Sequence, residues 1–164
     1  MSATRYAATL DVNGVTYPVE VEAGATLLHT VRDVIGLTGS KEGCDDSECG
    51  ACMMLLDGRP VNACSYLTLQ AEGRVIATVE GLSAGDDLHP LQQAFLEEGA
   101  VQCGFCTPGM LMSATALLGS NPDPTEEDVR VALSGNLCRC TGYDGIVKAV
   151  LRVSREGDTR KQTQ

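Results

Sequence analysis

Eight cysteines are the residues of this chain best suited to chemistry, and they fall into two groups of four. In the later group, Cys103 and Cys106 have C-x-x-C spacing just before Pro108, and a C-x-C pair follows farther along the chain. Thiolates supplied as two close pairs are typical of a metal site. We call these residues the second quartet: Cys103, Cys106, Cys138 and Cys140.

The earlier group, which we call the first quartet, comprises Cys44, Cys49, Cys52 and Cys64. Three of its members form a C-x4-C-x2-C run, and the fourth follows after eleven intervening residues. The run has the spacing of the plant-type [2Fe-2S] ferredoxin site. Glycines at positions 39, 43 and 50 let the backbone pass close to sulfur and turn its N–H groups toward a negatively charged cluster.

Zinc and disulfide bonds are the alternatives for these cysteines. Zinc accounts for a single quartet, but not readily for the C-x4-C-x2-C run together with a C-x-C pair. The first residues contain no apolar segment of the kind found in secretory signals, so we expect a cytoplasmic chain whose thiols stay reduced. The sequence therefore predicts two [2Fe-2S] clusters, which an absorption spectrum distinguishes from zinc.

Composition narrows the classes of partner. The chain has 164 residues, about the size of one or two small domains. Only 4% of the residues are aromatic and none is Trp, so the hydrophobic cores are expected to be small and bound metal is expected to add to their stability. The net charge of −10 argues against nucleic acid and against an anionic membrane surface. The hydrophobic fraction of 43% indicates neither disorder nor a membrane span.

In the N-terminal half, apolar and polar residues alternate through residues 5–22 around Asn13-Gly14, the preferred two-residue turn of a β-hairpin. Pro18 cannot donate to a ladder, which places the second strand at a sheet edge. Thr26 is the predicted N-cap of a helix that ends at Gly36. Further strands are predicted at 53–56, 60–64 and 74–79.

From Leu82 the apolar spacing changes to that of helices, and four short helices are predicted. Pro108 suits the first turn of the second, and Thr125 with Asp128 resembles a capping box for the third. The second quartet precedes the second and fourth helices, whose N-termini favour an anionic cluster. Both histidines are interpreted without a ligand role: His29 as solvated, and His89 as structural at a helix start.

No nucleotide-binding glycine loop is present, and no nucleophile motif pairs with a histidine. The chain is therefore interpreted as an electron relay without a substrate pocket. An iron-sulfur redox sensor and a stand-alone ferredoxin-like carrier are the alternatives. A sensor usually needs an output element such as a basic DNA-binding helix, and the acidic balance offers none.

Two resemblances extend this interpretation. Residues 4–80 resemble the β-grasp fold of plant-type ferredoxins, while segments 102–109 and 135–143 are similar to the second [2Fe-2S] site of the xanthine oxidase family of molybdenum hydroxylases. The implied fold class is α+β, with a ferredoxin-like β-grasp domain at 1–81 and a four-helix-bundle [2Fe-2S] domain at 82–154. A polar tail, mobile or laid on a partner, is expected at 155–164.

By its length the chain is similar to the separate small subunit of the multi-subunit members. The resemblance implies a molybdopterin-binding large subunit, with the cofactor as its cytosine dinucleotide, and an FAD-binding medium subunit, in a heterotrimer that can dimerise. It places the second quartet proximal to molybdenum and the first quartet on the FAD side. It also implies that Gln102 and Cys140 face the pterin, the alternative being that Gln102 caps the loop before the second helix. Glu48, Ala51 and Asn136 look closer to the heteroaromatic or aroyl-CoA members than to the carbon monoxide branch.

Overall fold

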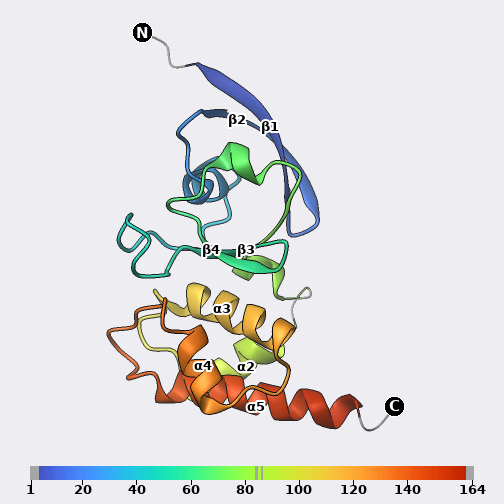
Figure 1. Cartoon of the computed structure of the whole chain (residues 1–164), viewed down its shortest axis with the longest axis vertical. Coiled ribbons are helices and arrows are strands. Elements are labelled where there is room, and N and C mark those ends of the chain that lie inside the picture. The colour runs from blue at the N-terminus through green and yellow to red at the C-terminus, as the bar shows by residue number, and fades with distance from the viewer. Residues whose placement is uncertain (1–3, 84, 86, 162–164) are drawn as a thin grey trace.

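The computed structural model describes residues 4–83, 85 and 87–161. A mixed β-sheet fills the N-terminal half and helices fill the C-terminal half, with α3 lying beneath the β3–β4 ribbon (Figure 1). The fold is α+β, as expected from the change of apolar spacing along the chain.

The first hairpin forms as predicted. Strands β1 (Arg5–Val12) and β2 (Val15–Glu22) pair antiparallel with Val12 opposite Val15. Asn13 and Gly14 adopt φ values of 54° and 77°, the left-handed conformations that a type I′ turn requires. Pro18 lies on β2, an edge strand, where its missing N–H breaks no ladder.

Three further strands complete the sheet: β3 (Met53–Leu56), β4 (Arg59–Asn62) and β5 (Val75–Ala77). The strand order is β2-β1-β5-β3-β4, with β1 and β5 parallel and the other pairs antiparallel. This arrangement fits a ferredoxin-like fold. Short 3₁₀ turns, η2 (Thr68–Ala71) and η3 (Val79–Gly81), flank β5.

The helix predicted after Thr26 is only partly regular. Thr26 caps α1 (Leu27–His29) by accepting the His29 N–H at 3.2 Å, as predicted. The chain then widens into a π-type turn, η1 (Thr30–Val34), with Ile35 N–H bonded to the Thr30 carbonyl at 3.0 Å. The wide turn keeps Val31 fully buried in the sheet's core and leaves Val34 half exposed, so the expected continuous α-helical stripe is wrong at its end.

Helices α2 (Pro90–Glu97), α3 (Thr107–Ser120), α4 (Glu126–Ala132) and α5 (Asp144–Lys161) follow. His89 and Thr125 are N-caps of capping boxes at α2 and α4, and Pro108 lies in the first turn of α3. Helix α5 continues past Ser154 into the segment expected to be a polar tail, since Arg152 pairs with Glu156 one turn on. Residues 162–164 lie outside the described residues.

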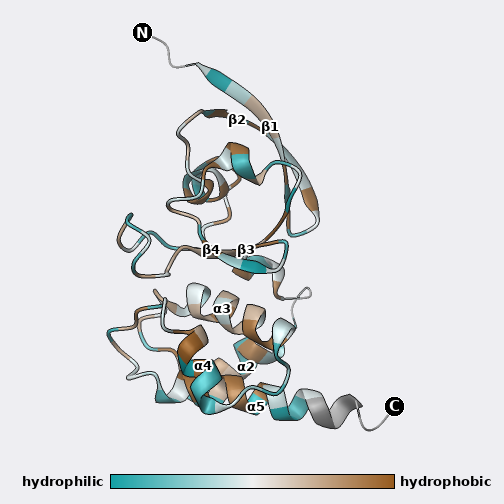
Figure 2. Ribbon diagram, viewed as in Figure 1, coloured by the Kyte–Doolittle hydropathy of each residue, from teal (hydrophilic) through white to brown (hydrophobic). Residues whose placement is uncertain are grey.

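Each half has its own hydrophobic core, and a smaller cluster of Met53, Leu55 and Met112 joins β3 to α3 between them. In Figure 2 part of α4 and part of the coloured stretch of α5 have the colour of hydrophilic residues. Within the described chain, every helix is too short or too polar to cross a lipid bilayer.

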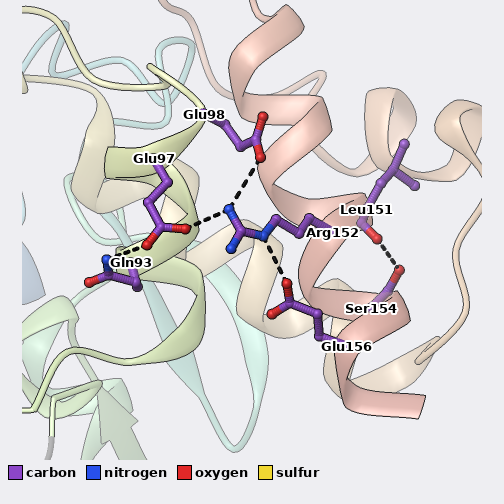
Figure 3. Close-up of polar contacts among 7 residues, drawn as sticks. All are labelled: Gln93, Glu97, Glu98, Leu151, Arg152, Ser154 and Glu156. Atoms are coloured by element: carbon purple, nitrogen blue, oxygen red, sulfur yellow. Dashed lines mark hydrogen bonds and ion pairs between the residues drawn. The ribbon is translucent and has the colours of Figure 1, made fainter. Parts of the chain in front are cut away.

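One arginine ties the last helix to α2. The Arg152 guanidinium on α5 contacts Glu97 at 2.5 Å and Glu98 at 3.3 Å, and its Nε bonds Glu156 at 2.8 Å (Figure 3). Glu97 also accepts a hydrogen bond from Gln93, so the acceptor is held in place on α2. Glu156 and Glu97 raise the pKa of Arg152, while the hydrogen bonds from Gln93 and Arg152 lower the pKa of Glu97. The network fixes the end of α2 just before the chain turns toward the second quartet.

Candidate iron-sulfur sites

The β3–β4 hairpin brings two members of the first quartet together. Cys52 directly precedes β3, Cys64 follows β4 after one residue, and the strand register opposes Met53 to Asn62. Cys52 and Cys64 are 2% and 5% exposed, within the core of the sheet half. The other two members lie on the loop before β3, where the Cys49 N–H donates to the Cys44 sulfur at 3.4 Å.

The loop of the first quartet is shaped to surround sulfur. Asp45, Ser47 and Gly50 have positive φ values of 63°, 67° and 66°, and left-handed residues interspersed in a loop are a feature of anion-binding backbone. A Cβ at Gly43 would lie 2.8 Å from the Cys49 sulfur, so only glycine allows this approach. Asn62 donates to the Ser47 carbonyl at 2.8 Å and fixes the loop to β4.

The second quartet is assembled from two loops that end at helices. Cys103 and Cys106 precede α3, and Cys138 and Cys140 precede α5. The sulfurs of Cys103 and Cys140 lie 3.6 Å apart. A tetrahedral metal with metal–sulfur bonds of about 2.3 Å holds two sulfurs about 3.8 Å apart. This pair is therefore spaced for one metal ion.

The remaining pair of the second quartet is Cys106 with Cys138. The Cys138 sulfur accepts hydrogen bonds from Thr141, at 3.1 Å from the hydroxyl and 3.4 Å from the N–H. Burial opposes ionisation of Cys138, but the bonds from Thr141, together with those from Cys140 and Cys106, outweigh it and lower the pKa of that thiol to about 7. Burial, with help from Cys138, raises the pKa of Cys106 to about 12.

Burial also raises the pKa of Cys52 to about 12, and neighbouring Cys64 and Cys49 add to the shift. Metal ligands must be thiolates, so iron binding displaces the protons that these buried thiols hold at neutral pH. Such thiols are poor nucleophiles but good ligands once a cation compensates their charge. The electrostatics of both quartets therefore favour metal binding over catalysis by free cysteine.

The two quartets differ in accessibility. In the second, Cys103 and Cys140 are exposed, and the side chains of Phe105 and Leu137, which precede Cys106 and Cys138 in the chain, are 48% and 57% exposed. Gln102 is also exposed, and among the described residues none forms a hydrogen bond with its amide. One corner of the second quartet is thus open to a partner, whereas half of the first is buried.

The chemistry of the ligand set agrees with two-iron clusters. Each quartet offers four thiolates, the set that holds a [2Fe-2S] cluster with two sulfurs on each iron. In the part of the chain that the structure describes, no three His, Cys, Asp or Glu side chains gather tightly around a single ion. The cysteines are grouped in pairs, backbone N–H groups lie close to sulfur, and glycines leave space beside the cysteines. These features fit a two-iron cluster, which is larger than a single ion.

The two histidines lie on the surface and at a helix start. His29 pairs with Asp33 at 2.8 Å on an exposed surface, and the His89 ring accepts the Leu91 N–H at 3.1 Å as a helix cap, which confirms the structural role expected for His89. A groove of about 500 Å³ lies between α2, α3 and α5, lined by His89, Leu118 and Val153 among others. None of its lining residues belongs to either quartet.

Sequence reasoning missed several residues that support the ligands. The Tyr143 hydroxyl accepts the Cys138 N–H at 2.7 Å, and Tyr143 itself adopts a left-handed φ of 70°. Thr141 was not singled out, although its hydroxyl bonds the Cys138 sulfur. Asn136 was noted only for a family likeness, yet it contacts both halves. These residues could have been found in the sequence, because each is a polar residue within a few positions of a cysteine.

Comparison with known proteins agrees with this geometry. A 2Fe-2S iron-sulfur cluster binding domain matches residues 10–80, and a [2Fe-2S] binding domain matches residues 78–151. The chain is 56% identical to the nicotine 6-hydroxylase small subunit of Paenarthrobacter nicotinovorans, over 87% of this chain and 86% of that one. It is 51% identical to the nicotinate dehydrogenase small FeS subunit of Eubacterium barkeri, over 86% and 90%.

The chain belongs to the small iron-sulfur subunits of the xanthine oxidase family. Among solved structures, quinoline 2-oxidoreductase from Pseudomonas putida 86 has a chain that superposes with a TM-score of 0.91 at 44% identity, covering 96% of this chain and 97% of that one. As a small subunit of this family, the protein is an electron-transfer component of a molybdenum-dependent oxidoreductase and carries two [2Fe-2S] clusters. When bound, each cluster takes up and releases one electron.

Proposed function

We propose that this subunit assembles with a molybdopterin-binding large subunit and an FAD-binding medium subunit, as a heterotrimer that can dimerise, in the cytoplasm. The first quartet would hold the cluster distal to molybdenum, and the second quartet the proximal one. We also propose a division into folding units at 1–81 and 82–154, with α2 to α5 as a four-helix bundle and 155–164 as a polar extension.

The observation that carries the proposal is the open corner of the second quartet. Cys103 and Cys140 are exposed, and two half-exposed apolar side chains, Phe105 and Leu137, lie next to ligands in the chain. Exposed apolar side chains beside a functional group are typical of an interaction surface. A partner docked there would bring its redox centre closest to this pair of ligands, since the other pair is partly covered.

Gln102 is proposed to hydrogen-bond the pterin of the large subunit, and Cys140 to lie against it. The unpartnered Gln102 amide supports this role over a local cap, because a cap would bond nearby backbone. Gln102→Ala should retain both clusters but weaken cofactor retention in the complex, or slow reduction of the proximal cluster. Molybdenum content and stopped-flow absorbance measure these two effects.

For Gln102→Ala, the matched control is Gln70→Ala on η2, in the sheet half and outside both quartets. The control should behave as wild type. If Gln102→Ala showed normal turnover, normal molybdenum content and unchanged reduction kinetics, the placement of Gln102 at the pterin would be wrong.

The substrate is proposed to be a nitrogen-containing aromatic ring, because relatives named for nicotine, nicotinate and quinoline lie among the similar proteins. The molybdopterin is proposed to be the cytosine dinucleotide. The test is to purify the intact complex through a tag on this chain, and then to measure molybdenum, iron and flavin. Activity is assayed on N-heterocycles, aldehydes, purines and aroyl-CoA thioesters. Recovery of this chain without a molybdenum-containing partner would favour the sensor or the stand-alone carrier.

A further inference from the structure

The ligand loops of the two quartets touch through their main chains. The Leu137 N–H donates to the Cys49 carbonyl at 2.9 Å. Cys49 belongs to the first quartet, and Leu137 is bonded directly to Cys138 of the second. A path of covalent bonds therefore runs from one ligand sulfur to the other and is interrupted by a single hydrogen bond.

The buried side chain of Asn136 forms hydrogen bonds that stabilise the same contact. Asn136 is 2% exposed, and its amide nitrogen donates to the Gly50 carbonyl at 3.0 Å. Its carbonyl oxygen accepts from the Ser113 hydroxyl on α3 at 2.6 Å. One buried carboxamide thus joins the loop after Cys49, the helix after Cys106 and the loop before Cys138.

The contact leaves no clearance for side chains. A Cβ at Gly50 would lie 2.3 Å from the Gly135 carbonyl oxygen and 2.6 Å from the Asn136 amide nitrogen. Nearby, a Cβ at Gly43 would lie 3.5 Å from the Phe105 ring, so that aromatic side chain also approaches the first loop. The two halves are therefore held together at fixed backbone separation beside the ligands of both quartets.

We propose that Asn136 is a positioning residue for electron transfer, which holds the Leu137–Cys49 hydrogen bond as the route between the two clusters. We call Cys49, Gly50, Asn136 and Leu137 the seam. The inference rests on the proposed relay function, and it adds which residues set the coupling. Electron tunnelling falls steeply with distance and is weaker across gaps than along bonds. A buried, fully satisfied amide is the kind of group that keeps such a distance constant.

The test replaces the carboxamide by a side chain of similar size that cannot form hydrogen bonds. Asn136→Leu is prepared as the full chain with both clusters loaded, confirmed by iron and sulfide analysis. Amide hydrogen exchange at Leu137 should become several-fold faster. Electron equilibration between the clusters after flash photoreduction should become several-fold slower, and the magnetic interaction between them in reduced samples should weaken. Each cluster's own spectrum should be retained.

Two further variants keep the test decisive. Ser113→Ala removes only the bond to the Asn136 oxygen, and should show smaller changes in the same direction. Asn121→Leu is the control, since the Asn121 side chain accepts the Asp123 N–H in the turn after α3, away from the cysteine loops of both quartets. It should leave Leu137 exchange and equilibration at wild-type values.

If Asn136→Leu loads both clusters and keeps wild-type exchange, coupling and rate, the proposal is overturned. If Asn136→Leu fails to bind both clusters, the same measurements on Ser113→Ala decide the question: wild-type exchange, coupling and rate in that variant overturn the proposal. Because dithionite or light supplies the electrons, no molybdenum partner is needed. A wild-type chain that fails to hold two clusters refutes the relay itself, whereas an unaffected variant of a loaded chain refutes only the role of the seam.

Discussion

Cys64 offers a test of whether one proposed ligand can be changed without disturbing the other site. It lies just after β4 in the core of the sheet half, and all members of the second quartet lie beyond residue 100. Cys64→Ser should lower the iron content from about four atoms to about two per chain, because each quartet is proposed to hold one two-iron cluster. Low-temperature EPR of the reduced protein should retain the signal of the second cluster.

The reciprocal variant Cys106→Ser should spare the first cluster and serves as the control. Loss of both signals in Cys64→Ser, with the helices still present by circular dichroism, would show that the quartets are wrongly divided.

Residue types and spacing were sufficient to propose the two cysteine quartets as ligands, because each quartet follows from local turns that the sequence displays. They were insufficient for the residues that support the ligands. Tyr143 bonds Cys138 from a left-handed backbone conformation that Tyr seldom adopts, so its role follows from tertiary context rather than propensity. The burial of Asn136 likewise depends on the meeting of two halves that periodicity treats separately.

At the scale of elements, the N-terminus of α2 is expected to depend on pH. The neutral His89 ring accepts the Leu91 N–H, and burial lowers the pKa of His89 below its ordinary value of 6.5. The folded protein therefore binds fewer protons than the unfolded chain as pH falls through that range. Its stability is complete above the unfolded pKa and decreases below it.

His89→Asn should remove this part of the pH dependence, because Asn is a good N-cap that does not titrate in this range. The measurement is the urea midpoint of the cluster-loaded chain at about pH 7 and about pH 5, a range in which ordinary histidines change charge. His29→Asn should retain the part of the decrease that comes from His89. An equal decrease in His89→Asn and wild type would contradict the capping explanation.

Among the elements, those with strong local signals were predictable: the Asn-Gly hairpin, the Thr26 cap, and the capping box at Thr125. The π-type turn η1 was not predictable, because it accompanies the burial of Val31 against a sheet formed by residues distant in sequence. The length of α5 was underestimated because polar composition was interpreted as a tail, although the Arg152 and Glu156 pair supports helix.

At the scale of the whole molecule, the chain taken alone should be an electron carrier and nothing more. In the described part of the chain, the groove near His89 is lined by no member of either quartet and contains no nucleophile paired with the His89 ring, whose acceptor nitrogen bonds the helix backbone. The cluster-loaded chain should accept electrons from dithionite yet turn over no organic substrate. Absorbance bleaching measures the first property, and product analysis on the substrate panel measures the second. Substrate-dependent bleaching by the isolated chain would refute the relay.

The close approach of Gly109 to Gly50 also bears on how such a protein can be rebuilt. A Cβ at Gly109, in the first turn of α3, would lie 2.1 Å from the Gly50 carbonyl oxygen. If either half is fused to the complementary half of another protein, a side chain at the matching position will clash here unless that protein also has glycine. A chimera should therefore retain glycine at both positions. A recombinant chain that lacks one of the two glycines should be unable to pack its two halves together.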